Sequence, residues 1–259
     1  MSAIQQSMIA AAATPRTSTG AVIGRYPGDI RARPGRWIDW NLGDPASTDS
    51  TSRVIATRLC NAVALESDDR VLNIAAVTAH MCRPGRAALP FADGEFDVVL
   101  VGLGAVCAAD HHKMAQELLR VCRRGGRLGL ACWTPDGFDG RLISIINRYA
   151  PRSEASDSPV RWGTREHLDA LFGRSADALG AFGRTHTWRF ASPAAWLDLS
   201  RAPGGHLHDP YRVVDPDWHD QLTAELLALV DRFNEANDGS MLVKSDYLEF
   251  VVHKSTWQI

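Results

Sequence analysis

The sequence predicts an α/β protein with a shortened parallel sheet and a helical cap. A buried strand, an amphipathic helix and a second buried strand follow one another between residues 96 and 133, an order typical of parallel α/β units. Another short apolar run, at 71–77, precedes this block, and a long amphipathic helix and a last strand follow it after residue 218. The composition, with 45% hydrophobic and 22% charged residues, is that of an ordinary globular chain.

Composition and charge exclude several classes of protein. The chain has 28 basic and 30 acidic residues, interleaved along its length, so no nucleic-acid partner is expected. No apolar run approaches the roughly 18 residues of a membrane span, and no secretory signal is recognisable. The five cysteines are an odd number and form no CxxC pair, which predicts neither a disulfide framework nor a zinc site. We therefore expect a cytoplasmic protein with no membrane partner.

The first elements are predicted from apolar spacing. Residues 1–50 hold no clear periodic element and are interpreted as a partly flexible N-terminal arm, with the domain at 51–259. Residues 52–65 place apolar side chains on one helical face, and the run 71–77 is short and β-rich enough for a buried strand. The large apolar residues of the arm are confined to one short cluster, Trp37, Ile38, Trp40 and Leu42.

The block from 89 to 133 contains the clearest elements. Residues 96–101 form an apolar run expected to be a parallel strand covered on both faces. Asp110 is a good N-cap for a helix, which Gly125 and Gly126 are expected to end after two arginines in its last turn. Residues 127–133 then form another buried strand.

The C-terminal part alternates helices and strands. Helices are predicted at 142–149, from Thr164 to Phe172, and after Ser192, with a strand at 184–190. The strongest helix pattern runs from 218 to 237 and stops before Gly239, and 247–253 is the last strand. The region of about 186–240 is therefore predicted to be the cap.

At this point the sequence resembles a known family. The segment is LPFADGEFDVVLVGLGAVCAADHHKMAQELLRVCRRGGRLGLACWTPDG, and further matches are FASPAAWLDLS and LALVDRFNEANDGSMLVKSDYLEFVV. These segments resemble class I S-adenosylmethionine (SAM)-dependent methyltransferases of the ubiquinone/menaquinone-biosynthesis kind, methyltransferase type 11. The resemblance, over roughly 52–253, implies a Rossmann-like sheet with a reversed final hairpin, SAM as cofactor, and a small-molecule substrate of secondary metabolism.

The cofactor half departs from the family pattern. Asn73 stands where the family has an acid, and Ala75 and Val77 stand where it has glycines of a tight turn. Only residues 78–88 separate this strand from the LPF motif, too few for the second strand and its ribose-binding acid. The loop after the 96–101 strand, with Gly102, Leu103 and Gly104, is the other family cofactor position. The sequence thus predicts a degenerate member without productive SAM binding.

The candidate site residues, apart from Trp133, gather in one histidine- and tryptophan-rich region at 186–219. The histidines are candidates for acid–base catalysis, and the aromatic residues for binding a flat molecule; the alternative is that the tryptophans are core and the histidines surface residues. The catalytic candidates are His186, His206, His208 and His219, and the substrate-binding candidates are Trp133, Trp188, Trp196, Tyr211 and Trp218.

Other possible sites are interpreted as structural. His206 and His208 lie in a loop pattern without a third ligand fixed by spacing, so no metal site is predicted. The pair after Asp110, His111 and His112, is expected to be solvated at a helix start, and Cys107 is expected to pack.

Three functions remain open from the sequence. The first is a SAM-independent catalyst of a cyclisation or rearrangement. The second is a non-catalytic subunit of an active methyltransferase, and the third is a methyltransferase with an atypical cofactor site. Loss of the second strand is expected to uncover a sheet edge that cannot stay bare in water. This edge would be covered by the arm of the same chain, by a homodimer or heteromeric partner, or by a rearranged sheet.

Overall fold

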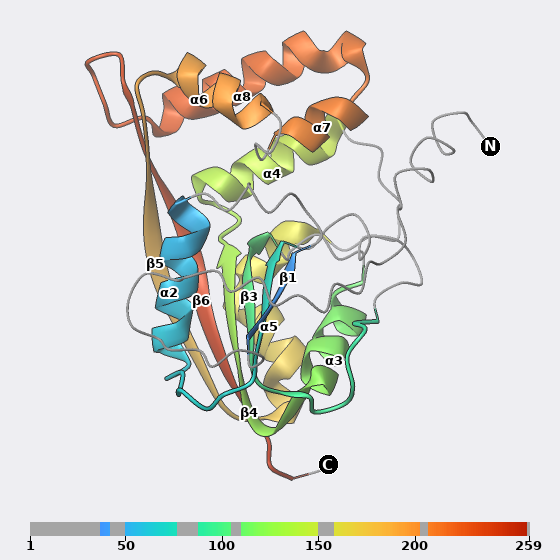
Figure 1. The fold of residues 1–259 in the computed structure, drawn as a ribbon. Helices are drawn as coiled ribbons and strands as arrows, with labels where there is room; N and C mark the ends of the chain where they lie inside the picture. The colour runs from blue at the N-terminus through green and yellow to red at the C-terminus, as the bar shows by residue number, and fades with distance from the viewer. Residues whose placement is uncertain are drawn as a thin grey trace, which may run out of the picture.

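The strands form a single mixed sheet. The computed structural model describes residues 37–41, 50–76, 88–104, 110–149, 158–202 and 207–257. Within these ranges lies a six-stranded sheet of order β1-β2-β3-β4-β6-β5 (Figure 1). The first four strands are parallel, and β6 is antiparallel to both β4 and β5. The strands are β1 (Trp37–Asn41), β2 (Val71–Ala76), β3 (Phe96–Gly104), β4 (Cys122–Trp133), β5 (Ala176–Phe190) and β6 (Met241–Lys254). The predicted adjacent parallel strands and the reversed final hairpin are confirmed.

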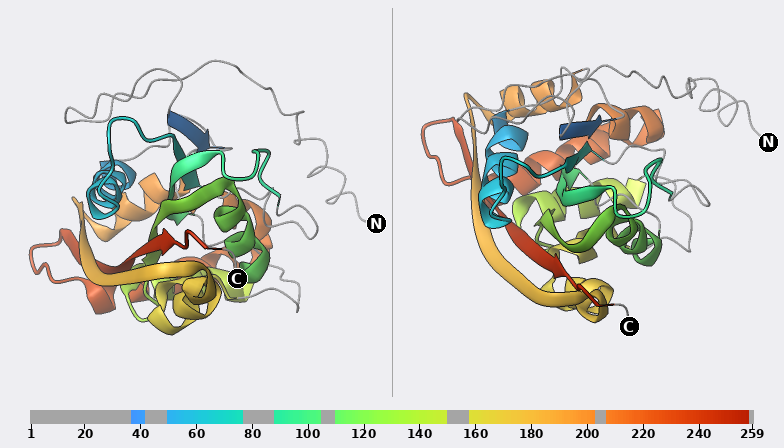
Figure 2. Two further views of the ribbon diagram at one scale, coloured as in Figure 1. Left: turned by 90° about the horizontal axis from the view of Figure 1, so that it is seen from below. Right: turned by 60° about the horizontal axis from the view of Figure 1, so that its bottom comes forward.

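Helices cover both faces and one end of the sheet. The helix α2 packs on one face, and α3 and α5 pack on the other (Figure 2). The helices α4, α6, α7 and α8 lie beyond the carboxyl ends of the parallel strands, where they form the cap (Figure 1). The helices are α2 (Ser50–Ala62), α3 (His111–Val121), α4 (Phe138–Tyr149), α5 (Arg165–Phe172), α6 (Pro193–Arg201), α7 (His208–Val213) and α8 (His219–Phe233). None of these described helices is both long and apolar enough to cross a membrane.

Part of the N-terminal arm forms the edge strand of the sheet. β1 pairs in parallel with β2, with Trp37 opposite Val71 and Ile38 opposite Leu72. This strand lies inside the segment expected to have no regular element, and it covers the β2 edge in cis, one of the three expected solutions. Its parallel direction brings the carboxyl ends of β1 and β2 to the same side of the sheet.

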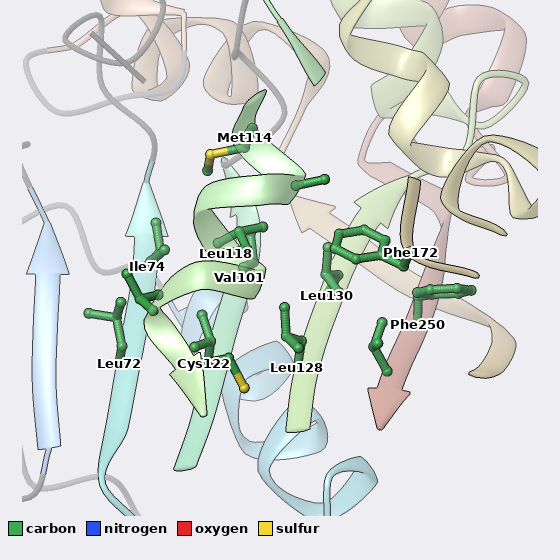
Figure 3. Packing of buried hydrophobic residues seen from close by; sticks show 14 of the residues in the cluster. Leu72, Ile74, Val101, Met114, Leu118, Cys122, Leu128, Leu130, Phe172 and Phe250 are labelled. Carbon is green, nitrogen blue, oxygen red and sulfur yellow. The ribbon is translucent and has the colours of Figure 1, made fainter. Parts of the chain in front are cut away.

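The core fills the space between the sheet and its helices. On the α3 and α5 face, Leu118, Leu130 and Phe172 are fully buried in one cluster (Figure 3). On the α2 face, Leu59 and Val251 belong to a second cluster. The predicted alternation of buried strands with amphipathic helices therefore corresponds to two apolar layers on either side of the sheet.

Two helix ends differ from the predictions. Asp110 caps α3 as expected, accepting a bond from the backbone N–H of Lys113 at 3.0 Å. However, α3 ends at Val121 and the chain passes directly into β4, so Gly125 and Gly126 lie in a strand. Gly125 has φ +65°, which allows the chain to turn there without the strain that a side chain would introduce.

The cap also contains less helix than predicted. α8 ends at Phe233, and Gly239, with φ +86°, lies in the turn before β6 rather than at the helix end. β5 continues to Phe190, so the first residues of the predicted 186–240 cap belong to the sheet. The physical reason is pairing: Arg189 and Phe190 are in register with β6.

A buried ion pair fixes α2 to the sheet. Arg127 donates two bonds of 2.6 Å to the carboxylate of Asp69, whose side chain is only 7% exposed. The same guanidinium donates to the carbonyls of Val63 and Ala64 just after α2. This arrangement satisfies carbonyl groups that a helix end leaves without partners.

Candidate functional site

Aromatic and polar side chains meet where the sheet ends under the cap. Trp133, the last residue of β4, lies edge to face with Tyr247 of β6, with ring centroids 5.9 Å apart. Trp188 of β5 lies beside Trp133, with centroids 6.4 Å apart. Two of the predicted substrate-binding residues are thus neighbours. We define the junction cluster as Trp133, Asp139, His186, Trp188 and Ser245.

Asp139 supplies a buried carboxylate to the junction cluster. Its residue is only 5% exposed, and its Oδ2 accepts a 2.8 Å bond from the indole Nε1 of Trp188. Its backbone N–H donates to the hydroxyl of Ser245 at 3.1 Å. Asp139 also lies in the first turn of α4, where the helix dipole favours a negative charge. The carboxylate is therefore held by both the sheet and a helix end.

Asp139 was not among the predicted site residues, because the apolar spacing placed the start of the helix at Leu142. The structure begins α4 at Phe138, so the acid lies in the first turn. The available signal was an acidic residue a few positions after a buried strand, followed by an amphipathic pattern. That pattern also occurs at ordinary helix starts, so it would not by itself distinguish a site.

His186 brings an imidazole to the same aromatic surface. It lies two residues before Trp188 on β5, and so on the same face of the strand. The two rings are edge to face with centroids 4.6 Å apart, and His186 is half-buried. An imidazole can gain or lose a proton near neutral pH. Trp188 therefore contacts both a carboxylate and an imidazole.

Charged side chains continue the cluster along the same sheet face. Glu249 is 2% exposed and accepts a 2.9 Å bond from Arg184, and this bond raises the pKa of the Arg184 guanidinium. Arg58 of α2 donates to the hydroxyl of Tyr247 at 3.3 Å. Burying a carboxylate without such a partner would cost free energy. The bond from Arg184 therefore explains why Glu249 can be buried in the fold.

Trp196 and Trp218, two other predicted residues, belong to the cap. Trp196 is fully buried and packs against Phe138, with centroids 5.8 Å apart, so it is a core residue of the cap. Trp218 is 50% exposed and precedes α8 instead of continuing its apolar stripe. His206 and the side chain of His208 lie outside the described residues.

Tyr211 and His219 form a second, smaller group. Their rings are edge to face with centroids 5.2 Å apart. The hydroxyl of Tyr211 is 2.7 Å from that of Thr223, and Nε2 of His219 is 3.1 Å from the carbonyl of Val214. These contacts join α7 to α8, so the structure divides the predicted aromatic region into a junction part and a cap part.

One of the two histidines predicted to be solvated is buried. His111 is 0% exposed, and its Nδ1 lies 2.7 Å from Nε2 of His167 in α5. His112 is exposed, as expected. The expectation failed for His111 because its partner is 56 residues away in the sequence and no local pattern connects them.

The described cysteines are buried, unreactive thiols. Burial raises the pKa of Cys60 to about 11 and those of Cys122 and Cys132 to about 12, so their thiols stay protonated. Cys107 lies outside the described residues. Within the described part of the chain, no group of three or more histidine, cysteine or acidic residues could hold a metal ion.

The cofactor positions predicted from the family lie only partly within the described residues. Asn73 is 3% exposed and pairs with Leu100, and β2 continues to Ala76, which lies opposite Gly104 after a shift in register that follows Ile74. Ala75, expected in a tight turn, therefore lies in the strand, as do Gly102 and Leu103. Val77 lies outside the described residues.

Three comparisons with known proteins bear on the family. Residues 46–130 match the model of a methyltransferase domain. An uncharacterised protein of Mycobacterium tuberculosis is 36% identical over 171 residues, which cover 64% of this chain and 61% of that protein. A second one from the same organism is 38% identical over 126 residues, which cover 48% of this chain and 46% of that protein. The chain therefore matches less than two thirds of the length of either relative.

Solved structures give a weaker likeness. A Bacillus halodurans protein, provisionally named a methyltransferase, is 14% identical, covers 77% of this chain and 98% of its own, and has a TM-score of 0.45. The YcgJ protein of Bacillus subtilis is 15% identical, covers 78% of each chain, and has a TM-score of 0.38. The fold assignment depends on the strand order and on the domain match. On these grounds residues 46–130 resemble a methyltransferase domain, and the chain has a Rossmann-like mixed sheet.

Proposed function

We propose that this protein binds a flat small molecule at the junction cluster and rearranges or cyclises it by acid–base chemistry, without transferring a methyl group from SAM. The observation that carries the proposal is the buried carboxylate of Asp139, bonded to Trp188 beside His186. The position supports it as well, because ligands of α/β proteins bind at the carboxyl ends of parallel strands.

The proposed chemistry assigns a role to each side chain. Trp133 and Trp188 provide aromatic faces against which a planar ring system can stack. The carboxylate of Asp139 accepts a proton from the substrate, and the imidazolium of His186 returns one to another substrate atom. The two transfers leave the total number of substrate protons unchanged, as an isomerisation or cyclisation requires. No external oxidant or reductant is needed.

The SAM-independent part is tested by isothermal titration calorimetry. The full chain is titrated with SAM and, separately, with its demethylated product S-adenosylhomocysteine. Asn73 and Ala75 stand where the family has an acid and a glycine, and this departure leads us to expect no binding in the micromolar range. Micromolar binding of either compound would overturn this part of the proposal.

Binding at the junction cluster is tested with a planar aromatic probe. We expect 2-naphthol to bind the full chain, and Trp188→Leu to weaken binding by roughly tenfold, since a stacked aromatic contact is worth about 1 kcal/mol or more. The matched control is Trp218→Leu, because Trp218 is 50% exposed on the cap. Equal affinities in the two variants would place the probe elsewhere and contradict the proposed site.

A second candidate function is supported by one observation, the pairing of β1 with β2. The arm there fills a sheet position that the family fills with a later strand, so SAM binding by an altered route is the alternative. Micromolar SAM binding in the same calorimetric experiment would favour it. The third candidate, a non-catalytic subunit, instead predicts a stable complex with a second methyltransferase-like chain and no binding of 2-naphthol by this chain alone.

A further inference from the structure

We infer that Trp162, His111 and His167 form a second ligand site, which binds an anionic oxygen group such as a carboxylate or a phosphate. This site lies on the α3 and α5 face of the sheet, whereas the junction cluster lies on the α2 face. The inference uses different residues and does not depend on the proposed function.

The first observation is a buried hydrogen-bond donor. Trp162 lies in the 3-10 segment η3 (Pro159–Gly163) and is 3% exposed. Within the described part of the chain, its indole Nε1 has no hydrogen-bond partner. An indole N–H can only donate, and leaving such a donor without an acceptor is unfavourable. A ligand that supplies an oxygen acceptor would remove that penalty.

The second observation is the histidine pair beside this indole. The ring centroid of Trp162 lies 5.3 Å from that of His111 and 6.4 Å from that of His167. The 2.7 Å contact between the two imidazoles holds one proton between one donor and one acceptor nitrogen. The pair can take up a further proton as an imidazolium, and an anion beside it stabilises that charged form.

The helix geometry around the pair also favours an anion. His111 is the first residue of α3 and His167 lies in the first turn of α5, so both helices begin at this cluster. Thr164 does not cap α5 with its side chain, since its hydroxyl donates instead to the carbonyl of Arg161 at 2.8 Å. Helix starts attract anions, and the Thr164 hydroxyl leaves that position open at α5, whereas the carboxylate of Asp110 already occupies it at α3.

The described charged residues at the starts of α3 and α5 are bonded to one another. On α3, Asp110 caps the helix and is paired with Lys113 at 3.2 Å. On α5, Arg165 is paired with Asp169 at 2.7 Å, and Glu166 is an exposed acid of the first turn. Each helix start thus carries a basic residue that is already bonded to an acid, so the inferred ligand depends on the indole donor of Trp162.

The experiment is a titration followed by nuclear magnetic resonance. The full chain, labelled with ¹⁵N at tryptophan and histidine, is titrated at pH 7 with sodium acetate and, separately, with sodium phosphate, at ionic strength held constant with sodium chloride. The indole signal of Trp162 is identified by its loss in Trp162→Phe. We expect a saturable shift of this signal, and the stronger of the two ligands identifies the preferred anion.

Two further results are expected. Trp162→Phe keeps the ring but removes the donor, so it weakens binding by about tenfold or more. The bound anion raises the pH at which the signals of His111 and His167 titrate. Trp257→Phe is the matched control, because Trp257 is 82% exposed, and it leaves both results unchanged.

Two outcomes would overturn the inference. The first is the absence of a saturable shift of the Trp162 signal with either anion. The second is equal anion affinity in Trp162→Phe and the unaltered chain. If Trp162→Phe does not fold, His167→Gln replaces it; it leaves Trp162 in place, and unchanged anion affinity in that variant contradicts the site.

Discussion

The bond between Asp139 and Trp188 gives a direct test of the junction cluster. Asp139 is 5% exposed and accepts the indole N–H at 2.8 Å. A hydrogen bond to a charged group contributes about 1.5–3 kcal/mol, and a carboxylate in the first turn of a helix adds about 0.3–1 kcal/mol. Asp139→Ala is therefore expected to lower the free energy of unfolding by about 2–4 kcal/mol.

The assay is a double-mutant cycle followed by urea denaturation. Asp139→Ala, Trp188→Phe and the double variant are compared with the unaltered chain, and the non-additive part isolates the pairwise interaction. We expect a coupling free energy of about 1.5–3 kcal/mol. Asp139→Asn keeps an oxygen acceptor and loses the charge, so its cost is expected to lie well below that of Asp139→Ala.

Trp218→Phe is the control for this cycle. Because Trp218 is 50% exposed on the cap, its substitution is expected to add to that of Asp139→Ala without coupling. A coupling below about 0.5 kcal/mol between Asp139 and Trp188 would be within the scatter of independent sites. That result would refute the bond and remove the structural basis of the junction cluster.

Three other predictions follow from the structure. Gly163→Ala is expected to destabilise the fold by about 3 kcal/mol or more, because its Cβ would lie 1.9 Å from the carbonyl oxygen of Trp133; Gly173→Ala, which meets nothing within 4 Å, is its control in thermal unfolding. The bond from Arg120 lowers the pKa of Glu117, so its stabilisation is present above the unfolded pKa, about 4.3–4.5, and is lost as the pH falls through the lower folded value. Glu117→Gln should therefore cost stability at pH 7 and much less near pH 3, and an equal loss at both pH values would contradict this. Deletion of residues 1–41 removes β1 and should cause aggregation or a large fall in melting temperature, whereas an equally stable monomer would show that β1 does not protect the edge.

The fold was largely predictable because its elements have strong local patterns. The strand at 96–101 and the helix after Asp110 occur where apolar spacing placed them. The errors occur where tertiary contacts override local signals. Gly125 and Gly126 looked like a helix end, but β3 pairing extends β4 back to Cys122. Likewise, pairing with β6 draws Phe190 into the sheet instead of the cap.

The candidate site was predictable only in its aromatic part. Trp133, Trp188 and His186 stand out by residue type, and the structure brings them together. Their carboxylate, Asp139, resembles any helix start in the sequence. His111 was assigned to solvent because its burial depends on His167, which lies in another helix. Contacts between distant segments have no periodicity, so single-sequence reasoning cannot find them.

The position of β1 in the sheet and its place in the sequence lead to different expectations for the cofactor. In a parallel pair the carboxyl ends lie on the same side, and the register places Asn41 opposite Ala76. In the sequence β1 precedes β2, whereas the family resemblance implies that the strand at this position follows it. The five residues of β1 close the sheet edge. The calorimetric titration decides whether that end of the sheet also serves a ligand or whether β1 only covers the edge.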